Sequence, residues 1–183
     1  VPGIFAAGIY QINVLVSQII ASGLEGGSIA SLQYSVRLQE LVLGLFVVSI
    51  AQVILPTLSE QTARGDTSAV KETLRHATAM MALVTLPATV GLILIGPEVI
   101  ALLFEFGEFD SDSTDMTAFA LTFHALGLFA IAATRVFQQV FYTYRAMTTP
   151  TYASFVVLLR NVALCIILAI PLHHGGIALA GSL

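Results

Sequence analysis

Long uncharged apolar runs dominate this chain, and the clearest are Val1–Leu24, Leu41–Leu58 and Ala77–Ile95. A helix of about 20 apolar residues crosses a hydrocarbon core of about 30 Å. Inside lipid the backbone must satisfy its own hydrogen bonds, so such runs predict transmembrane helices. Composition agrees, because 10% of the residues are charged and 57% are hydrophobic, whereas soluble domains carry about 25% charged residues.

The runs predict an all-α, polytopic transmembrane helix bundle with five full spans and the start of a sixth. Clusters of Gly, Pro and polar residues separate the spans, and Gly96-Pro97 is expected to end the third helix. The chain starts without Met and ends inside an apolar run, so we expect a single partial lobe, 1–183, of a longer protein. The expected spans are 1–24, 28–58, 77–95, 113–144, 151–172 and a truncated 177–183.

The basic residues of the loops predict an orientation. Loop 59–76 contains Arg64, Lys71 and Arg75, and loop 145–150 contains Arg145, whereas the other loops contain no Lys or Arg. Since Lys and Arg near spans favour the cytoplasmic side, these two loops are expected to be cytoplasmic. The loop between the third and fourth spans is acidic and is expected to face outward.

One polar stripe runs down the second predicted span. Gln33, Arg37, Glu40 and Gly44 lie at i, i+4, i+7 and i+11, which places them on one helix face. A charge within a membrane is costly and usually faces a bundle interior or a watery cavity. Arg37 therefore either lines a cavity for an anionic substrate, since its planar fork suits phosphate, or forms a structural ion pair with Glu40.

Three further polar positions lie within predicted spans. Arg135 either extends toward the cytoplasmic interface or makes a second cavity contact. Arg160 lies near the middle of its span, where a structural partner or a ligand could neutralise it. Asn13 and its neighbours on the first span either line a cavity or form hydrogen bonds between helices.

The sequence contains no motif of an intramembrane enzyme. HExxH and Gly-x-Ser-x-Gly are absent, and Lys71 is the single lysine and lies in a loop. Asp110-Ser-Asp112 resembles a metal–nucleotide motif, but its place before a helix favours a cap. We therefore expect no catalytic residue, no metal site, no cofactor and no nucleic-acid partner, and not an enzyme.

Several segments form a set whose order and spacing extend along nearly the whole chain. They are Ser28–Leu38 followed by Gly44, Leu55–Ser59, Leu103–Asp110, Phe141-Tyr142 leading to Thr149-Pro150, and Gly176–Ala180. Together these segments resemble the MurJ (MviN) family of the MOP exporter superfamily, and they correspond to helices seven to twelve of a fourteen-helix protein.

The resemblance implies part of a lipid II flippase. Such a protein moves the undecaprenyl-pyrophosphate-linked peptidoglycan precursor across the bacterial inner membrane by alternating access. Arg37 corresponds to the family's cavity arginine, Glu40 to the nearby acidic residue and Ser31 to a cavity-facing position. The implied partners are lipid II, membrane lipid, and the N-terminal lobe and C-terminal helices of the same protein. The expected substrate-binding residues are Arg37, Glu40, Ser31, Gln33 and Asn13, with Arg135 and Arg160 as secondary candidates.

Two other functions fit the same residues. A related MOP exporter would move drugs or other lipid-linked sugars, and a non-transporting membrane scaffold would bind cell-wall precursors. The chain also departs from the family pattern, with Val36 where Asp is common and Val42 where Pro is frequent.

Overall fold

The computed structural model describes residues 2–24, 26–144 and 148–182, and these fold almost entirely into helices. No strand occurs in these ranges, so the predicted all-α class is confirmed. The elements are α1 Pro2–Ser22, α2 Ser28–Val42, the π-helical segment η1 Leu43–Val48, α3 Ser49–Ala63, α4 Thr67–Phe104, α5 Ser111–Leu126, α6 Leu128–Thr143 and α7 Thr148–Ser182.

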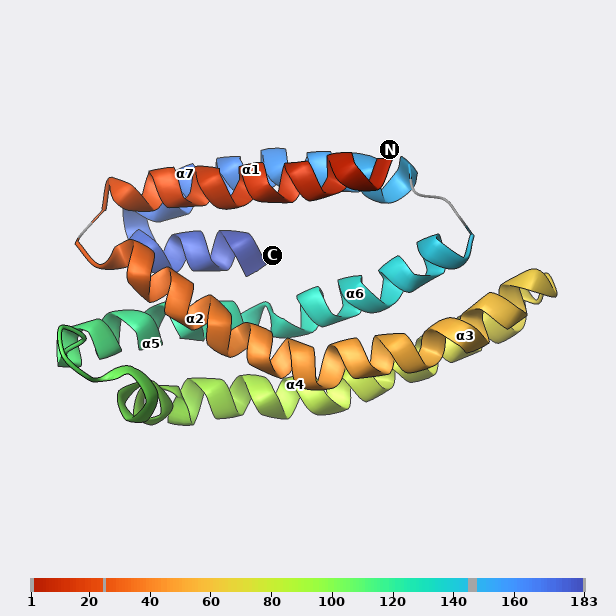
Figure 1. Ribbon diagram of the computed structural model, residues 1–183, viewed down its shortest axis with the longest axis horizontal. Coiled ribbons are helices and arrows are strands. Elements are labelled where there is room, and N and C mark those ends of the chain that lie inside the picture. The colour runs from red at the N-terminus through yellow and green to blue at the C-terminus, as the bar shows by residue number, and fades with distance from the viewer. Residues whose placement is uncertain (1, 25, 145–147, 183) are drawn as a thin grey trace.

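The helices form two packed groups that α2 and α5 connect (Figure 1). In one group α1 lies along α7, and their contact buries Ala21, Cys165, Ile177 and Ala180. In the other group η1, α4 and α6 enclose the largest apolar cluster. That cluster consists of Leu43, Val47, Ala77, Met81, Leu128, Ala132 and Val136.

The outer surface is strongly apolar. Side chains such as Val53, Leu83 and Ile170 are 75%, 76% and 81% exposed, whereas soluble proteins rarely expose large contiguous apolar patches. By length and apolar composition, Ser28–Ala63 and Thr67–Phe104 could each cross a membrane, and α5 with α6 adds a third if the bent pair counts as one span. The stretches Gln11–Ser22 and Tyr152–Leu168 are apolar but shorter. The count of five spans and the start of a sixth stays a prediction.

The predicted helix break at Gly96-Pro97 is wrong, because α4 continues through both residues to Phe104. Proline in a helix interior removes one hydrogen bond and costs about 3 kcal/mol. Packing opposes that cost here. Gly96 is buried against α5, and a Cβ in its place would lie 2.9 Å from Leu121 Cδ2. α4 therefore stays continuous at Gly96, where the lack of a side chain allows close contact with α5.

The predicted single helix over 113–144 is instead divided at Gly127, with a bend of 47° between α5 and α6. Carbonyl groups left free at such a break need hydrogen-bond donors. Gln39 Nε2 donates to the carbonyl of His124 at 2.6 Å, and Thr89 Oγ1 donates to that of Ala125 at 3.1 Å. Side chains from α2 and α4 thus hold the break from two directions.

Replacing Gln39 with leucine should destabilise the full-length protein by about 1–3 kcal/mol, because the buried carbonyl of His124 would lose its side-chain donor. The melting temperature of the purified protein in detergent measures this effect. Gln11→Leu is the matched control, since Gln11 is exposed on α1. Equal melting temperatures for the two variants would contradict this role of Gln39.

The chain bends sharply within α7 at His173, where φ is 49° and ψ is −132°. This kink lies within the turn that we predicted between the fifth and sixth spans, and it folds the last helical segment back toward the middle of the bundle (Figure 1). Next to it, His174 Nε2 lies 3.0 Å from the carbonyl oxygen of Met116 on α5. The kink is therefore anchored to the connecting helix α5.

Candidate binding cavity

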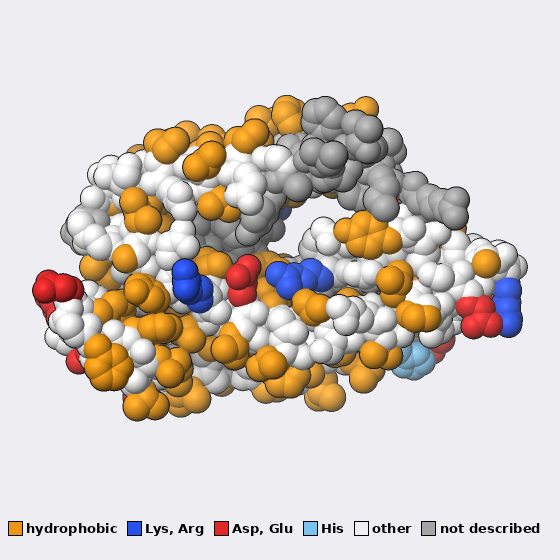
Figure 2. All heavy atoms as spheres, in the orientation of Figure 1, with side chains coloured by type: hydrophobic (Ala, Val, Ile, Leu, Met, Phe, Trp, Pro, Cys, Tyr) orange, Lys and Arg blue, Asp and Glu red, His pale blue; other side chains and the backbone are white. Residues whose placement is uncertain are grey.

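A cavity of about 660 Å³ lies between the α1–α7 pair and the wall formed by α2, α5 and α6. Figure 2 shows the molecule hollowed between these groups, with basic and acidic side chains along the rim. Its lining residues are Asn13, Val14, Ser17, Gln18, Ala21, Ile29, Leu32, Gln33, Val36, Arg37, Gln39, Glu40, Leu43, His124, Ile131, Arg135, Asn161, Ile177 and Gly181.

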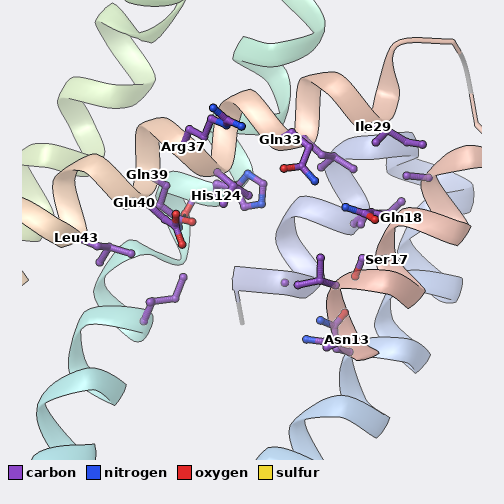
Figure 3. A pocket seen from close by; sticks show the side chains of 18 of the residues that line it. Asn13, Ser17, Gln18, Ile29, Gln33, Arg37, Gln39, Glu40, Leu43 and His124 are labelled. Atoms are coloured by element: carbon purple, nitrogen blue, oxygen red, sulfur yellow. The ribbon is translucent and has the colours of Figure 1, made fainter. Parts of the chain in front are cut away.

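The polar stripe of α2 forms one wall of this cavity. Gln33, Arg37 and Glu40 all line it, as their shared helix face predicts (Figure 3). Ion pairs among the described residues lie elsewhere, at Arg64–Glu60, Arg75–Glu72 and His76–Glu72 on α3 and α4. The ion pair between Arg37 and Glu40, one of the two alternatives from sequence, is thus not formed within the described part of the chain.

The opposite wall comes from α1 and α7. Asn13, Ser17 and Gln18 line it from α1 (Figure 3), and Asn161 lines it from α7. The Asn13 Oδ1 atom is buried without a hydrogen-bond partner in the described structure. Deeper in the interface, the Cys165 thiol donates to Asn161 Oδ1 at 2.9 Å, and Ser17 Oγ lies 4.0 Å from Cys165 Sγ. The α1 stripe therefore both lines the cavity and joins two helices.

The other candidate residues separate into two groups. Arg135 lines the cavity from α6, which is one of the two alternatives that the sequence left open for it. Ser31 is 3% exposed, and the cavity lining does not include it. Arg160 is exposed and also lies outside the lining, whereas the adjacent Asn161 is within it.

Sequence reasoning missed two of the polar lining residues, Gln39 and His124. Gln39 lies off the Arg37 stripe, and a lone histidine such as His124 is more often packed inside a helix bundle than part of a site. His124 is indeed buried, with Nδ1 3.0 Å from Ser35 Oγ, but its ring also borders the cavity. A signal was present in the helix pattern, because Ser35 and Gln39 are spaced by one helical turn.

The cavity combines positive charge with apolar walls. Its charged lining residues are Arg37, Arg135 and Glu40, so two positive charges and one negative charge give a formal net charge of +1. The apolar lining includes Val14, Ile29, Leu32 and Ile131. Among the described residues no cluster of three or more His, Cys, Asp or Glu side chains could hold a metal ion. These surroundings suit an anionic, amphipathic ligand, because arginine binds phosphate oxygens in pairs.

The acidic loop near the start of α5 has a structural explanation. Asp110 Oδ1 accepts hydrogen bonds from Ser113 N at 3.0 Å and Ser113 Oγ at 2.9 Å, which confirms the cap interpretation of Asp110-Ser-Asp112. The backbone N–H of Ser113, with its hydroxyl, holds the pKa of Asp110 below its ordinary value. The cap therefore contributes its full stability above the pKa that the Asp110 carboxyl has in the unfolded chain. This stability is lost as the pH falls through the lowered pKa of the folded state.

Long apolar helices around a polar, partly cationic cavity define a polytopic membrane transporter fold. The family model for Lipid II flippase MurJ matches residues 1–183. The chain belongs to this family.

Individual relatives agree with the family model. A probable lipid II flippase MurJ of Treponema pallidum is 36% identical over 173 residues, which are 94% of this chain and 33% of the relative. The corresponding protein of Thermotoga maritima is 33% identical, over 94% of this chain and 35% of the relative. A solved structure of lipid II flippase MurJ in an inward closed conformation matches with a TM-score of 0.84 and 30% identity, covering 97% of this chain and 37% of that one. The chain thus spans about a third of the length of these relatives.

Proposed function

We propose that this chain is one wall of the substrate cavity in a lipid II flippase of the bacterial inner membrane. The observation that carries the proposal is Arg37, which lines a 660 Å³ amphipathic cavity and has no ion-pair partner among the described residues. The names of the relatives supply the substrate, lipid II. We propose that the remaining two thirds of the relatives' length supplies further helices that close the cavity.

In this proposal the guanidinium of Arg37 binds the pyrophosphate of lipid II. Its fork donates two parallel hydrogen bonds to phosphate oxygens, and water exclusion strengthens them. Arg135 adds positive charge from α6, while Glu40 limits the net charge to +1. That balance favours release as well as binding, and transport requires both. No covalent change of the substrate is involved.

Alternating access requires helices that bend. Two features of the described fold supply bending points beside the cavity. One is the π-helical η1, Leu43–Val48, directly after the Arg37 stripe. The other is the α5–α6 break at Gly127. Within an α-helix, π-helical turns often occur at functional sites, and we propose that both points absorb motion between the lobes.

We propose that the α3–α4 end of the molecule faces the cytoplasm. Arg64, Lys71 and Arg75 lie there, next to the turn between Ala63 and Thr67. The positive-inside rule supports this orientation. The other basic loop residue, Arg145, falls within 145–147, outside the described residues. The acidic loop before α5 would then face outward.

Depletion of the full-length protein in its own cell tests the function. We expect lipid II to accumulate on the cytoplasmic side, because synthesis continues while translocation stops. Extraction of lipid II, with an externally added enzyme that degrades only outward-facing molecules, measures both amount and sidedness. Unchanged sidedness after depletion would refute the flippase assignment, and a change confined to another lipid-linked sugar would indicate a related exporter.

A further inference from the structure

A second, smaller hollow of about 260 Å³ lies beside the main cavity, between η1–α3 and α6. Its polar lining consists of Gln52, Arg135, Gln138, Gln139 and Tyr142. Arg135 lines both hollows, so the two spaces adjoin at its side chain.

The side chains of this hollow have unused hydrogen-bonding capacity. Gln139 Nε2 has a long contact of 3.5 Å with the Arg135 carbonyl. Within the described ranges, the side chains of Gln52, Gln138 and Tyr142 have no hydrogen-bond partner, although all three are exposed. Amides and a phenol are unfavourable against lipid tails. This face must therefore contact water, protein or a polar ligand.

The chemistry of the lining is selective. Three amides and one phenol provide both donors and acceptors, and no carboxylate lines the hollow. Positive charge is confined to Arg135, at the junction with the main cavity. An aliphatic chain would leave these amides unpaired, whereas hydroxyl and amide groups of a ligand would pair with them.

The spacing also fits an extended group. Arg135, Gln138, Gln139 and Tyr142 lie at i, i+3, i+4 and i+7 along α6. Seven residues of helix extend the stripe over about 10 Å at 1.5 Å per residue. A ligand whose anionic part lies near Arg37 and Arg135 would place its adjoining polar part along this stripe.

We propose that the second hollow is a subsite for the hydroxyl- and amide-rich sugar part of a lipid-linked pyrophosphate. This subsite rests on the proposed function, in which the main cavity holds the pyrophosphate. The two spaces then divide the recognition of one ligand. Arginine side chains bind the charged group, and the amide stripe of α6 recognises the oligosaccharide part.

Binding of two lipids to the purified full-length protein tests this division. One lipid is lipid II, and the other is undecaprenyl pyrophosphate, which lacks the headgroup. We expect the double variant Gln138→Leu, Gln139→Leu to bind lipid II about 30-fold more weakly, since about 1 kcal/mol is lost for each of two hydrogen bonds. Its affinity for undecaprenyl pyrophosphate should stay within about twofold of the wild type.

The controls separate this inference from the function on which it rests. Gln11→Leu makes the same change on α1, outside both hollows, and should alter neither affinity. If the double variant does not fold, the variant Tyr142→Phe tests the subsite instead. We expect it to lose about fivefold in affinity for lipid II alone. Equal weakening for both lipids, or none for either, would overturn the subsite and leave the flippase proposal intact. If the wild-type protein binds neither lipid, both the subsite and the flippase proposal are overturned.

Discussion

Arg37→Ala in the full-length protein is expected to abolish growth of a strain that depends on this protein. The substitution removes a charged donor pair from the cavity wall, and hydrogen bonds to charged groups contribute about 1.5–3 kcal/mol each. Loss of one such pair, about 3–6 kcal/mol in total, should weaken substrate binding by more than about 100-fold. Complementation of the depleted strain, with protein levels checked by immunoblot, measures the effect. Lipid II should accumulate at the same time.

Two further variants make this result specific. Arg64→Ala removes an arginine that is paired with Glu60 on the exposed α3–α4 turn at 2.5 Å, and it should support normal growth. Arg37→Lys keeps the charge but loses the planar fork, so we expect partial activity. Normal growth of Arg37→Ala at normal protein levels would show that Arg37 has no role in substrate binding.

Gly176→Ala is expected to prevent accumulation of folded protein. After the kink at His173, Gly176 lies against α7 itself, and a Cβ there would overlap the backbone carbonyl of Leu168. A backbone group cannot move aside as a side-chain tip can, so the kink would have to open. Overpacking in a core costs about 1–3 kcal/mol even where side chains can adjust, and a backbone collision should exceed that range. The yield of monodisperse full-length protein in detergent measures the effect.

Gly91→Ala provides the matched comparison on α4. No atom lies within 4 Å of a Cβ built at Gly91, and the residue is inside a helix. Alanine there should leave the yield unchanged or stabilise the protein by up to about 1 kcal/mol. A normal yield for Gly176→Ala would mean that the kink adjusts more easily than its close backbone contact indicates.

The helix class and the approximate helix positions could be predicted because apolar runs of membrane length leave few alternatives. The breaks were harder to predict. Gly96-Pro97 carries the residues of a helix end, but close packing on Leu121 keeps α4 continuous. The predicted span 113–144 runs through Gly127, yet Gln39 and Thr89 supply donors that stabilise a break there. Both outcomes depend on neighbours distant in sequence.

Some of the residues that line the cavity could be predicted from helix periodicity. Gln33, Arg37 and Glu40 share one face of one helix, so periodicity alone brought them together. Arg135 also lines the cavity, but sequence could not decide between cavity and interface. Ser31 and Arg160 were candidates but lie outside the lining, because the rotation of a helix about its axis depends on packing. The residue of α7 that lines the cavity is therefore Asn161 and not its neighbour Arg160.

The pairing of α1 with α7 has a consequence for biosynthesis. Ser17 on α1 and Cys165 on α7 are 148 residues apart in the chain. At about 5–20 residues per second, the ribosome needs about 7 to 30 s to make the partner of the first helix. During that interval Asn13, Ser17 and Gln18 have no α7 beside them. The packing of α1 therefore has to wait for a helix that is made much later in synthesis.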